Sequence, residues 1–365
     1  MNRGHISSVL PLALLSENCY YADNVCKYGD ILMNTEFISL NEERNVSLTA
    51  YLQPVGGRLK NLLQRPAVLI LPGGGYHVCV DSEADPVAYP YLNAGYHVFI
   101  LRYSVMEHAA WPNPLNDYEQ AISLIRKRAE EWHVASDRIA VIGFSAGGHL
   151  AACAATMSVN RPDAAVLGYP LITADSIHDY LVSAPDAAEA VDEKTCPCFV
   201  FATRTDNQVP VENSLRFVSA LERYDIAFET HIYANGPHGL STGDPALTAE
   251  KFSSRYRNWI SDSIAWLNEV LGGFGPQGLS GPEFGVRING NYEETLNLAS
   301  TVQYVMQNPQ GREVLSFFRQ LEENGRPLPS AAAKVMTISS CLTYFGVSGE
   351  TVRRVEAELK AIKNR

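Results

Sequence analysis

The chain has 365 residues and a formal net charge of −11, with 46% hydrophobic and 19% charged residues. This length and hydrophobic content suit one large globular domain and a second small one. Because nucleic-acid binding needs a clustered excess of Lys and Arg, the negative charge argues against a nucleic-acid partner. A run of about 18 apolar residues is absent from the sequence, so we expect no membrane-spanning helix and no membrane partner.

The N-terminal residues 9–15 are apolar, but this segment is short, contains Pro11 and lacks a small-residue cleavage site after it. It matches a signal peptide poorly, and we therefore expect a cytoplasmic protein. The odd number of cysteines, seven, fits this expectation, and their spacing suggests no disulfide framework. Cys196 and Cys198 lead into a predicted strand, where alternate residues face opposite sides, so we expect buried structural thiols rather than metal ligands.

In chain order, the first predicted elements are strands at residues 36–40 and 46–52, which flank a polar segment and predict an antiparallel hairpin at a sheet edge. From about residue 66 to residue 266, short apolar runs alternate with helix-like segments. Runs of this kind are typical of strands buried on both faces. They cover residues 67–71, 96–101, 139–142, 164–167, 198–201 and 228–233.

The segments between these runs have helical periodicity. In residues 115–132, for example, Tyr118, Ile122 and Ile125 recur at the spacing of one helix face. Strands that alternate with helices predict a parallel sheet with helices on both faces. The sequence therefore predicts an α/β fold whose sheet is mostly parallel, with an antiparallel N-terminal edge.

The composition changes at residues 272–282, which are rich in Gly and Pro and form either a linker or a loop packed on the surface. Beyond them, helices are predicted at residues 293–308, 312–322 and 349–364, with Ser348 as the N-cap of the last one. We therefore predict an α/β domain over residues 1–271, a linker over 272–285 and a small all-helical module over 286–365. The amphipathic stripes of this module favour packing or a homo-oligomer over ligand binding.

The pentapeptide Gly143-Phe-Ser-Ala-Gly147 carries the strongest chemical signal. It has the form G-x-S-x-G, follows the apolar run at residues 139–142 and precedes a helix-forming segment. At a sharp turn from strand to helix, a serine takes a strained backbone conformation, and small neighbours let other chain segments pass close by. The helix N-terminus brings N–H groups toward developing negative charge. Ser145 is therefore the predicted nucleophile, and the alternative is a plain glycine-rich turn.

A second signal, Pro72-Gly-Gly-Gly-Tyr76, ends the run at residues 67–71. Loops of the H-G-G-G type supply backbone N–H groups to an oxyanion hole, and here Pro72 stands in the place of His. We predict that Gly74, Gly75 and Ala146 donate these N–H groups, the alternative being a flexible turn. Tyr76 and His77 are candidate substrate contacts, although a structural role is the more common one for His77.

Two further polar residues follow predicted strands. Asp206 comes after the run at residues 198–201, and His238 comes after the run at residues 228–233. Open α/β sheets gather their sites at the carboxyl ends of strands, and the order Ser145, Asp206, His238 is that of a Ser-Asp-His triad on such a sheet. Together the motifs indicate nucleophilic catalysis with His238 as general base, oriented by Asp206. No metal-binding or dinucleotide-binding motif appears, so we expect no cofactor and no metal.

These residues give the sequence its resemblance to the α/β-hydrolase esterases of the acetyl esterase, acetylxylan esterase and BD-FAE-like group. It resembles them over residues 35–270, most closely in residues 72–76, 111–149 and 206–214 and at His238-Gly239. The resemblance implies a serine carboxylesterase that hydrolyses short-chain, chiefly acetyl, esters of a sugar or oligosaccharide through an acyl-enzyme. Residues 170–196 form a shorter segment than such enzymes often carry there, which favours an open site.

The same residues are compatible with other functions. A serine peptidase or amidase of the same fold could use the same triad, because that triad also cleaves amides. A non-catalytic binding protein on this fold is less expected, because such proteins usually lose the serine or the histidine, and both are present here.

Overall fold

In the computed structural model, the described residues are 33–57, 59–283, 290–318 and 332–364. Residues 9–15, discussed above as a poor signal peptide, lie outside them. None of the helices in these ranges is long and apolar enough to cross a membrane. The cytoplasmic location and the homo-oligomer stay predictions.

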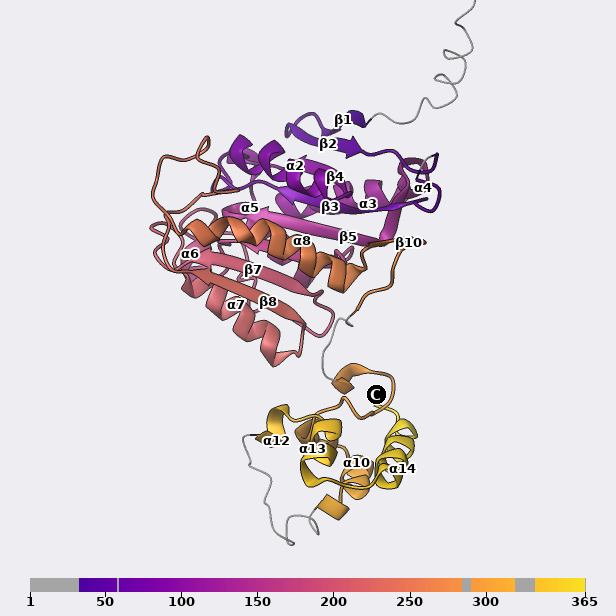
Figure 1. The fold of residues 1–365 in the computed structure, drawn as a ribbon. Coiled ribbons are helices and arrows are strands. Elements are labelled where there is room, and N and C mark those ends of the chain that lie inside the picture. Colours follow the sequence, from indigo (N-terminus) through magenta and orange to yellow (C-terminus); the bar gives the residue numbers. More distant parts are fainter. Residues whose placement is uncertain (1–32, 58, 284–289, 319–331, 365) are drawn as a thin grey trace, which may run out of the picture.

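An eight-stranded sheet forms the centre of the first domain, in the order β1-β2-β4-β3-β5-β6-β7-β8 (Figure 1). The N-terminal hairpin is its antiparallel edge, since β2 pairs antiparallel with both β1 and β4, and all other neighbours are parallel. The predicted α/β fold is therefore confirmed. The strands are β1 (Asn34–Asn41), β2 (Val46–Leu52), β3 (Arg65–Leu71), β4 (His97–Arg102), β5 (Val134–Phe144), β6 (Ala164–Gly168), β7 (Cys198–Thr203) and β8 (Phe228–Tyr233).

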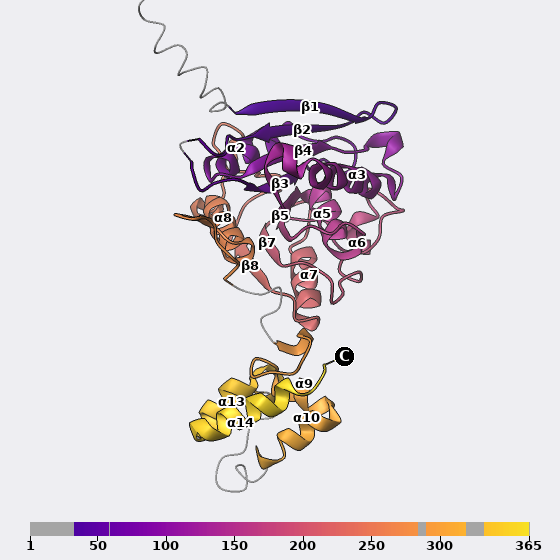
Figure 2. The same cartoon turned by 90° about the vertical axis from the view of Figure 1, so that its right-hand side faces the viewer.

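Helices cover both faces of the sheet, as Figure 2 shows. On one face pack α2 (Asp85–Asn93) and α8 (Asn258–Leu271). On the other pack α3 (Asn113–Lys127), α5 (Ser145–Met157) and α7 (Glu212–Arg223). Alternate residues of β3 pack into the hydrophobic cores on the two faces of the sheet, with Leu69 in one core and Val68 and Ile70 in the other. This alternation explains why the strands are apolar throughout.

Short elements connect these layers. The helical segment predicted at residues 115–132 is divided into α3 and α4 (Ala129–Trp132), and it ends where His133 takes a left-handed conformation with φ of 55°. The other short helices of the domain are η1 (Asp81–Glu83), η2 (Met106–His108), α6 (Ala174–Ile177) and η3 (Ser254–Arg257).

Of the two alternatives for the Gly- and Pro-rich segment, a linker or a loop packed on the surface, residues 272–283 follow the second, because they pack on the α/β domain. They contain the small antiparallel pair β9 (Phe274–Gly275) and β10 (Gly278–Leu279). Phe274 packs edge-on against Tyr96, with ring centroids 6.3 Å apart, and Arg138 donates a hydrogen bond to the Ser280 carbonyl at 2.6 Å. The structure of the domain thus continues beyond Leu271 to residue 283.

The C-terminal residues form helices around a separate hydrophobic cluster that includes Val305, Leu342 and Leu359. The helix predicted at residues 349–364 is α14, but it ends at Lys360, four residues earlier than predicted. Ser348 caps it by accepting a hydrogen bond from the Thr351 N–H, as predicted. Within its described residues, the elements with defined bounds are η4 (Gly290–Tyr292), α9 (Val302–Gln307), α10 (Pro309–Val314), α12 (Ala332–Val335), α13 (Ile338–Phe345) and α14 (Gly349–Lys360).

The helix predicted at residues 293–308 is wrong over its first half. Thr301 caps α9 through its side chain, so the helix begins only at Val302. The Asn308 side chain then caps α10, with Pro309 in its first turn, which separates the two helices. The helix predicted at residues 312–322 overlaps the end of α10 and, after a turn at residues 315–316, a helical segment at residues 317–318. Residues 319–322 of the prediction lie outside the described residues.

Candidate active site

Ser145 stands at the turn from β5 into α5 with a φ of 53°, a conformation that is rare for a non-glycine residue and marks local strain. The turn is so tight that a Cβ atom on Gly147 would lie 2.1 Å from the Leu71 carbonyl oxygen and 2.4 Å from that of Pro72. Only glycine therefore lets α5 approach the end of β3. The turn places Ser145, which is only 7% exposed, at the carboxyl edge of the sheet, where it lines a cavity.

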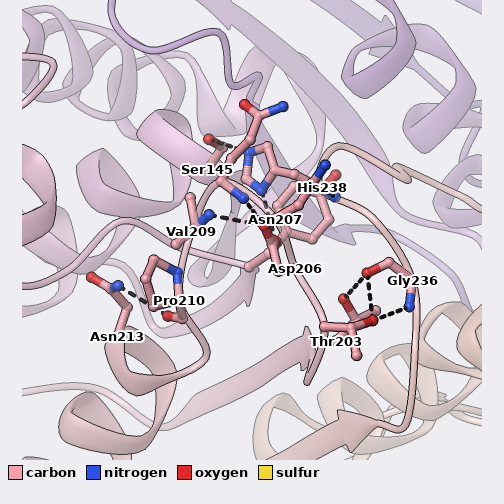
Figure 3. Close-up of polar contacts among 12 residues, drawn as sticks. Ser145, Thr203, Asp206, Asn207, Val209, Pro210, Asn213, Gly236 and His238 are labelled. Atoms are coloured by element: carbon pink, nitrogen blue, oxygen red, sulfur yellow. Dashed lines mark hydrogen bonds and ion pairs between the residues drawn. The ribbon is translucent and has the colours of Figure 1, made fainter.

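The structure brings the three polar residues predicted from the strand ends together (Figure 3). Ser145 Oγ lies 2.8 Å from His238 Nε2, and His238 Nδ1 lies 2.8 Å from Asp206 Oδ2. The other Asp206 oxygen, Oδ1, accepts hydrogen bonds from the N–H groups of Gln208 and Val209 at 2.9 and 2.8 Å. Because the Asp206 side chain is only 1% exposed and held in this way, Oδ2 is directed at the imidazole.

Hydrogen bonds between the two loops fix the position of His238. The His238 N–H donates to Asn207 Oδ1 at 3.1 Å. Two residues earlier, the Gly236 carbonyl accepts from the Thr203 hydroxyl at 2.7 Å, and its N–H donates to Thr205 Oγ1 at 3.0 Å (Figure 3). The ends of β7 and β8 therefore hold the acid and the histidine as one unit.

The glycine loop after β3 lies beside this group. Gly74 and Gly75 have φ values of 127° and 62°, and they line a cavity of about 360 Å³ together with Ser145 and His238. The hydrogen bonds found among the described residues leave the N–H groups of both glycines without an acceptor. Ala146 lies in the first turn of α5, where backbone N–H groups have no partner within the helix. The arrangement is suited to binding an anionic oxygen near Ser145.

The two candidate substrate contacts after the glycines differ in position. His77 lines the cavity, and its Nδ1 is 2.8 Å from the Gly75 carbonyl oxygen. Tyr76 does not line it, because its side chain is buried in the core, where its hydroxyl lies 2.7 Å from His149 Nδ1. The structure thus gives Tyr76 a packing position and corrects its placement among the substrate contacts.

Other cavity residues were not predicted. Gln208 lies within the motif that supplied Asp206 and could have been found there. Tyr180 comes from residues 170–196, and a Cβ atom on Gly75 would lie 2.8 Å from its ring. This segment was expected to leave the site open, yet it supplies a wall of the cavity. Glu83, from η1, had no sequence signal that would direct it inward.

His149, in the nucleophile helix, joins three segments around the site. Its Nε2 faces the Pro185 carbonyl oxygen at 2.8 Å and therefore carries the proton, so its Nδ1 accepts the hydrogen bond from the Tyr76 hydroxyl. Burial lowers the pKa of His149 to about 4. Burial likewise lowers the pKa of His97, whose Nδ1 accepts from the Gln53 N–H, to about 4.

We expect the protein to lose stability when the pH falls from about 6.5 to about 4, because the unfolded state binds protons to these histidines before the folded state does. Each histidine contributes at most about 1.4 kcal/mol per pH unit in that window, and the contribution is fully present above it. The free energy of unfolding by urea, measured at several pH values, should depend less steeply on pH in His149→Gln. The partly exposed His108→Gln should match the wild type, and identical slopes for all three proteins would contradict the prediction.

Comparisons with known proteins agree with this fold. A solved α/β hydrolase enzyme from a Medee basin deep-sea metagenome library is 42% identical, with a TM-score of 0.62, and the match covers 65% of this chain and 98% of that one. The chain therefore belongs to the α/β hydrolases. Within it, residues 59–166 match the BD-FAE family and residues 171–273 match the prolyl oligopeptidase family. The resemblance inferred from the motifs is thus confirmed.

Two curated relatives are named for xylan. Endo-1,4-beta-xylanase B of Butyrivibrio fibrisolvens is 32% identical over 212 residues, which are 50% of this chain and 33% of that protein. An acetylxylan esterase of Xylanibacter ruminicola is 27% identical over 227 residues, covering 56% of this chain and 47% of that protein. The chain thus spans between a third and a half of the length of these relatives.

Proposed function

We propose that this protein is a serine carboxylesterase that removes short acyl groups, chiefly acetyl, from a sugar or oligosaccharide. The observation that carries the proposal is the hydrogen-bonded series Ser145, His238 and Asp206, with 2.8 Å at each step. Beside it lie the N–H groups of Gly74 and Gly75, which have no acceptor in the part of the chain that the structure describes. The relationship to an acetylxylan esterase supports the choice of substrate class.

In the proposed mechanism, Ser145 Oγ attacks the ester carbonyl carbon while its proton passes to His238 Nε2. Asp206 accepts the Nδ1–H hydrogen bond and stabilises the imidazolium. The negative oxygen of the tetrahedral intermediate receives N–H groups from the glycine loop and from Ala146. The C–O bond to the alcohol then breaks, and His238 returns the proton to the departing oxygen. Water hydrolyses the acyl-enzyme by the same steps and releases the carboxylic acid and free Ser145.

The size and lining of the cavity support a small acyl group on a polar alcohol. Its volume of about 360 Å³ lies near the lower end of the range for small-molecule sites. His77, Ser82 and Gln208 offer polar groups there that suit sugar hydroxyls, and the Tyr180 ring offers a flat apolar surface. A long acyl chain would find little apolar surface in such a cavity.

A serine amidase or peptidase is the second candidate, and the match of residues 171–273 to the prolyl oligopeptidase family favours it. That match includes Asp206 and His238 but not Ser145 or the glycine loop, which lie in the part that matches the BD-FAE family. The same group of side chains could cleave either bond, so substrate preference has to distinguish the two.

We expect p-nitrophenyl acetate to be hydrolysed with a kcat/KM at least about 10-fold above that of the palmitate ester and of the acetyl anilide, which is the scale on which pocket fit discriminates substrates. Acetate release from acetylated xylo- and manno-oligosaccharides then identifies the sugar. Ser145→Ala serves as the blank for spontaneous hydrolysis. A higher kcat/KM for the anilide would favour the amidase over the esterase. A higher kcat/KM for the palmitate ester would contradict the assignment of short acyl groups.

A further inference from the structure

Glu83 is a buried carboxylate that the mechanism above does not use. It is 3% exposed, ends the short helix η1 and lines the same cavity as Ser145 and His238. Burying a carboxylate costs several kcal/mol unless hydrogen bonds or a counter-charge offset the loss of water. Both of its oxygens are hydrogen-bonded. Oε2 accepts from the Gly73 N–H at 2.7 Å, and Oε1 accepts from the Tyr169 hydroxyl at 2.6 Å.

The bond to Gly73 reaches the start of the glycine loop. A Cβ atom on Gly73 would lie 2.7 Å from Glu83 Oε2 and 3.0 Å from Ser145 Cβ, so this residue lies between the carboxylate and the nucleophile. The Gly73 carbonyl is also fixed, because it accepts from the Val80 N–H at 3.0 Å. The next two residues are Gly74 and Gly75. Glu83 therefore holds the peptide unit that directly precedes the proposed oxyanion donors.

The bond to Tyr169 reaches the other half of the site. Tyr169 follows β6, is 3% exposed, and its hydroxyl accepts a hydrogen bond from the Ser241 N–H at 2.9 Å while donating to Glu83. The edge of its ring packs against His238, with ring centroids 5.0 Å apart and planes at 71°. Tyr169 thus contacts both the carboxylate and the proposed general base.

Ser241 completes a closed network. It follows His238 by three residues, is 1% exposed and has a φ of 49°. Its hydroxyl donates to the Ser82 carbonyl at 2.5 Å, and its own carbonyl accepts from Tyr256 and Trp259 at 3.1 Å each. The loop that carries His238 is therefore attached to the turn that carries Glu83, through side chains that are remote in sequence.

We propose that Glu83 is a positioning residue that fixes the proposed oxyanion-hole loop relative to the His238 loop, through Gly73 on one side and Tyr169 on the other. This inference rests on the proposed function. In this role Glu83 transfers no proton, and its two carboxylate oxygens act as hydrogen-bond acceptors, one for each loop. Burial raises the pKa of Glu83, and the hydrogen bonds from Tyr169 and Gly73 and the nearby His238 act in the opposite direction.

Glu83→Gln tests the proposal with little change of shape. The glutamine NH₂ group cannot accept a hydrogen bond, so one of the two contacts is lost and its donor is left unpaired. We expect kcat for p-nitrophenyl acetate to fall about 10- to 100-fold, somewhat less than for the loss of an oxyanion donor itself, with KM changed less than about 3-fold. The affinity for an alkyl trifluoromethyl ketone, whose adduct with Ser145 places an oxyanion in the hole, should fall by the same factor as kcat/KM.

Tyr169→Phe keeps the ring against His238 and removes only the hydroxyl, so it should lower kcat in the same direction but less. In the double variant, kcat should be only slightly lower than in Glu83→Gln alone, because the two side chains act in one network. Asp81→Asn is the matched control. Asp81 lies in the same turn, but its carboxylate is 86% exposed and pairs with Arg102, so activity and inhibitor affinity should stay unchanged.

A kcat of Glu83→Gln within about 2-fold of the wild type would overturn the proposal, and so would a loss of kcat without a loss of inhibitor affinity, since oxyanion binding should change both. The melting temperature shows whether Glu83→Gln folds. If it does not, the kcat and the inhibitor affinity of Tyr169→Phe test the proposal instead. A wild type inactive on every ester would contradict the proposed function, whereas an active wild type with an equally active Glu83→Gln would contradict only the role of Glu83.

Discussion

Replacing Ser145 by alanine is expected to lower kcat for ester hydrolysis by about 10⁴- to 10⁶-fold, the range found when a serine nucleophile is removed from a triad. The reason is geometric. Ser145 Oγ is the group placed 2.8 Å from His238 Nε2, and it faces the cavity lined by Gly74 and Gly75. Without Oγ, no acyl-enzyme can form, and the loop can only stabilise the direct attack of water.

The measurement combines steady-state hydrolysis of p-nitrophenyl acetate with labelling by a fluorophosphonate, which reacts with an activated serine. Wild type should be labelled and Ser145→Ala should not. Ser261→Ala, which changes an exposed serine on α8, should retain full activity and labelling. A Ser145→Ala protein that keeps more than about 1% of kcat, or is still labelled, would refute the nucleophile, since a triad acts as a unit.

The same experiment extends to the other members of the series. Asp206→Asn should lower kcat about 10⁴-fold, because an asparagine side chain no longer holds the histidine in the required tautomer. The double variant Ser145→Ala/Asp206→Asn should have nearly the same kcat as Ser145→Ala alone, because Asp206 and His238 act only through the nucleophile. Independent, additive losses would show that Asp206 acts elsewhere, for example by holding the N–H groups of Gln208 and Val209.

The sequence predicts the sheet and the meeting of Ser145, Asp206 and His238 because the signals are local. Each strand is an apolar run with a clear end, and parallel strands place their carboxyl ends at one edge, so residues that follow them meet there. Sequence reasoning therefore finds the side chains that leave strand ends, without knowing the contacts between them.

What could not be predicted depends on contacts between distant segments. Glu83 and Tyr169 are hydrogen-bonded at 2.6 Å although 86 residues separate them. Tyr76 follows the glycines and looked like a substrate contact, yet its hydroxyl binds His149 from the nucleophile helix. In the C-terminal module the error was of another kind. Thr301 and Asn308 stand inside or at the end of the segment predicted as one helix, and their side chains cap α9 and α10 and so divide it.

The second large effect concerns stability. Replacing Gly147 by alanine is expected to destabilise the protein by more than about 4 kcal/mol, the range of the most severe single substitutions. The added Cβ atom would lie 2.1 Å from the Leu71 carbonyl oxygen and 2.4 Å from the Pro72 carbonyl oxygen. These are backbone atoms at the end of the central strand β3, so they cannot rotate away as the tip of a side chain could.

Gly273→Ala is the matched control, because its Cβ atom would meet Asn268 only at 3.4 Å, an ordinary contact. Its free energy of unfolding by urea should stay within about 0.5 kcal/mol of the wild type, as for most surface substitutions. Since Leu71 and Pro72 lead through Gly73 into Gly74 and Gly75, any Gly147→Ala protein that still folds must displace the glycine loop from Ser145. It should then bind the trifluoromethyl ketone weakly. A stable and fully active Gly147→Ala protein would contradict the close approach of α5 to β3 on which the proposed site depends.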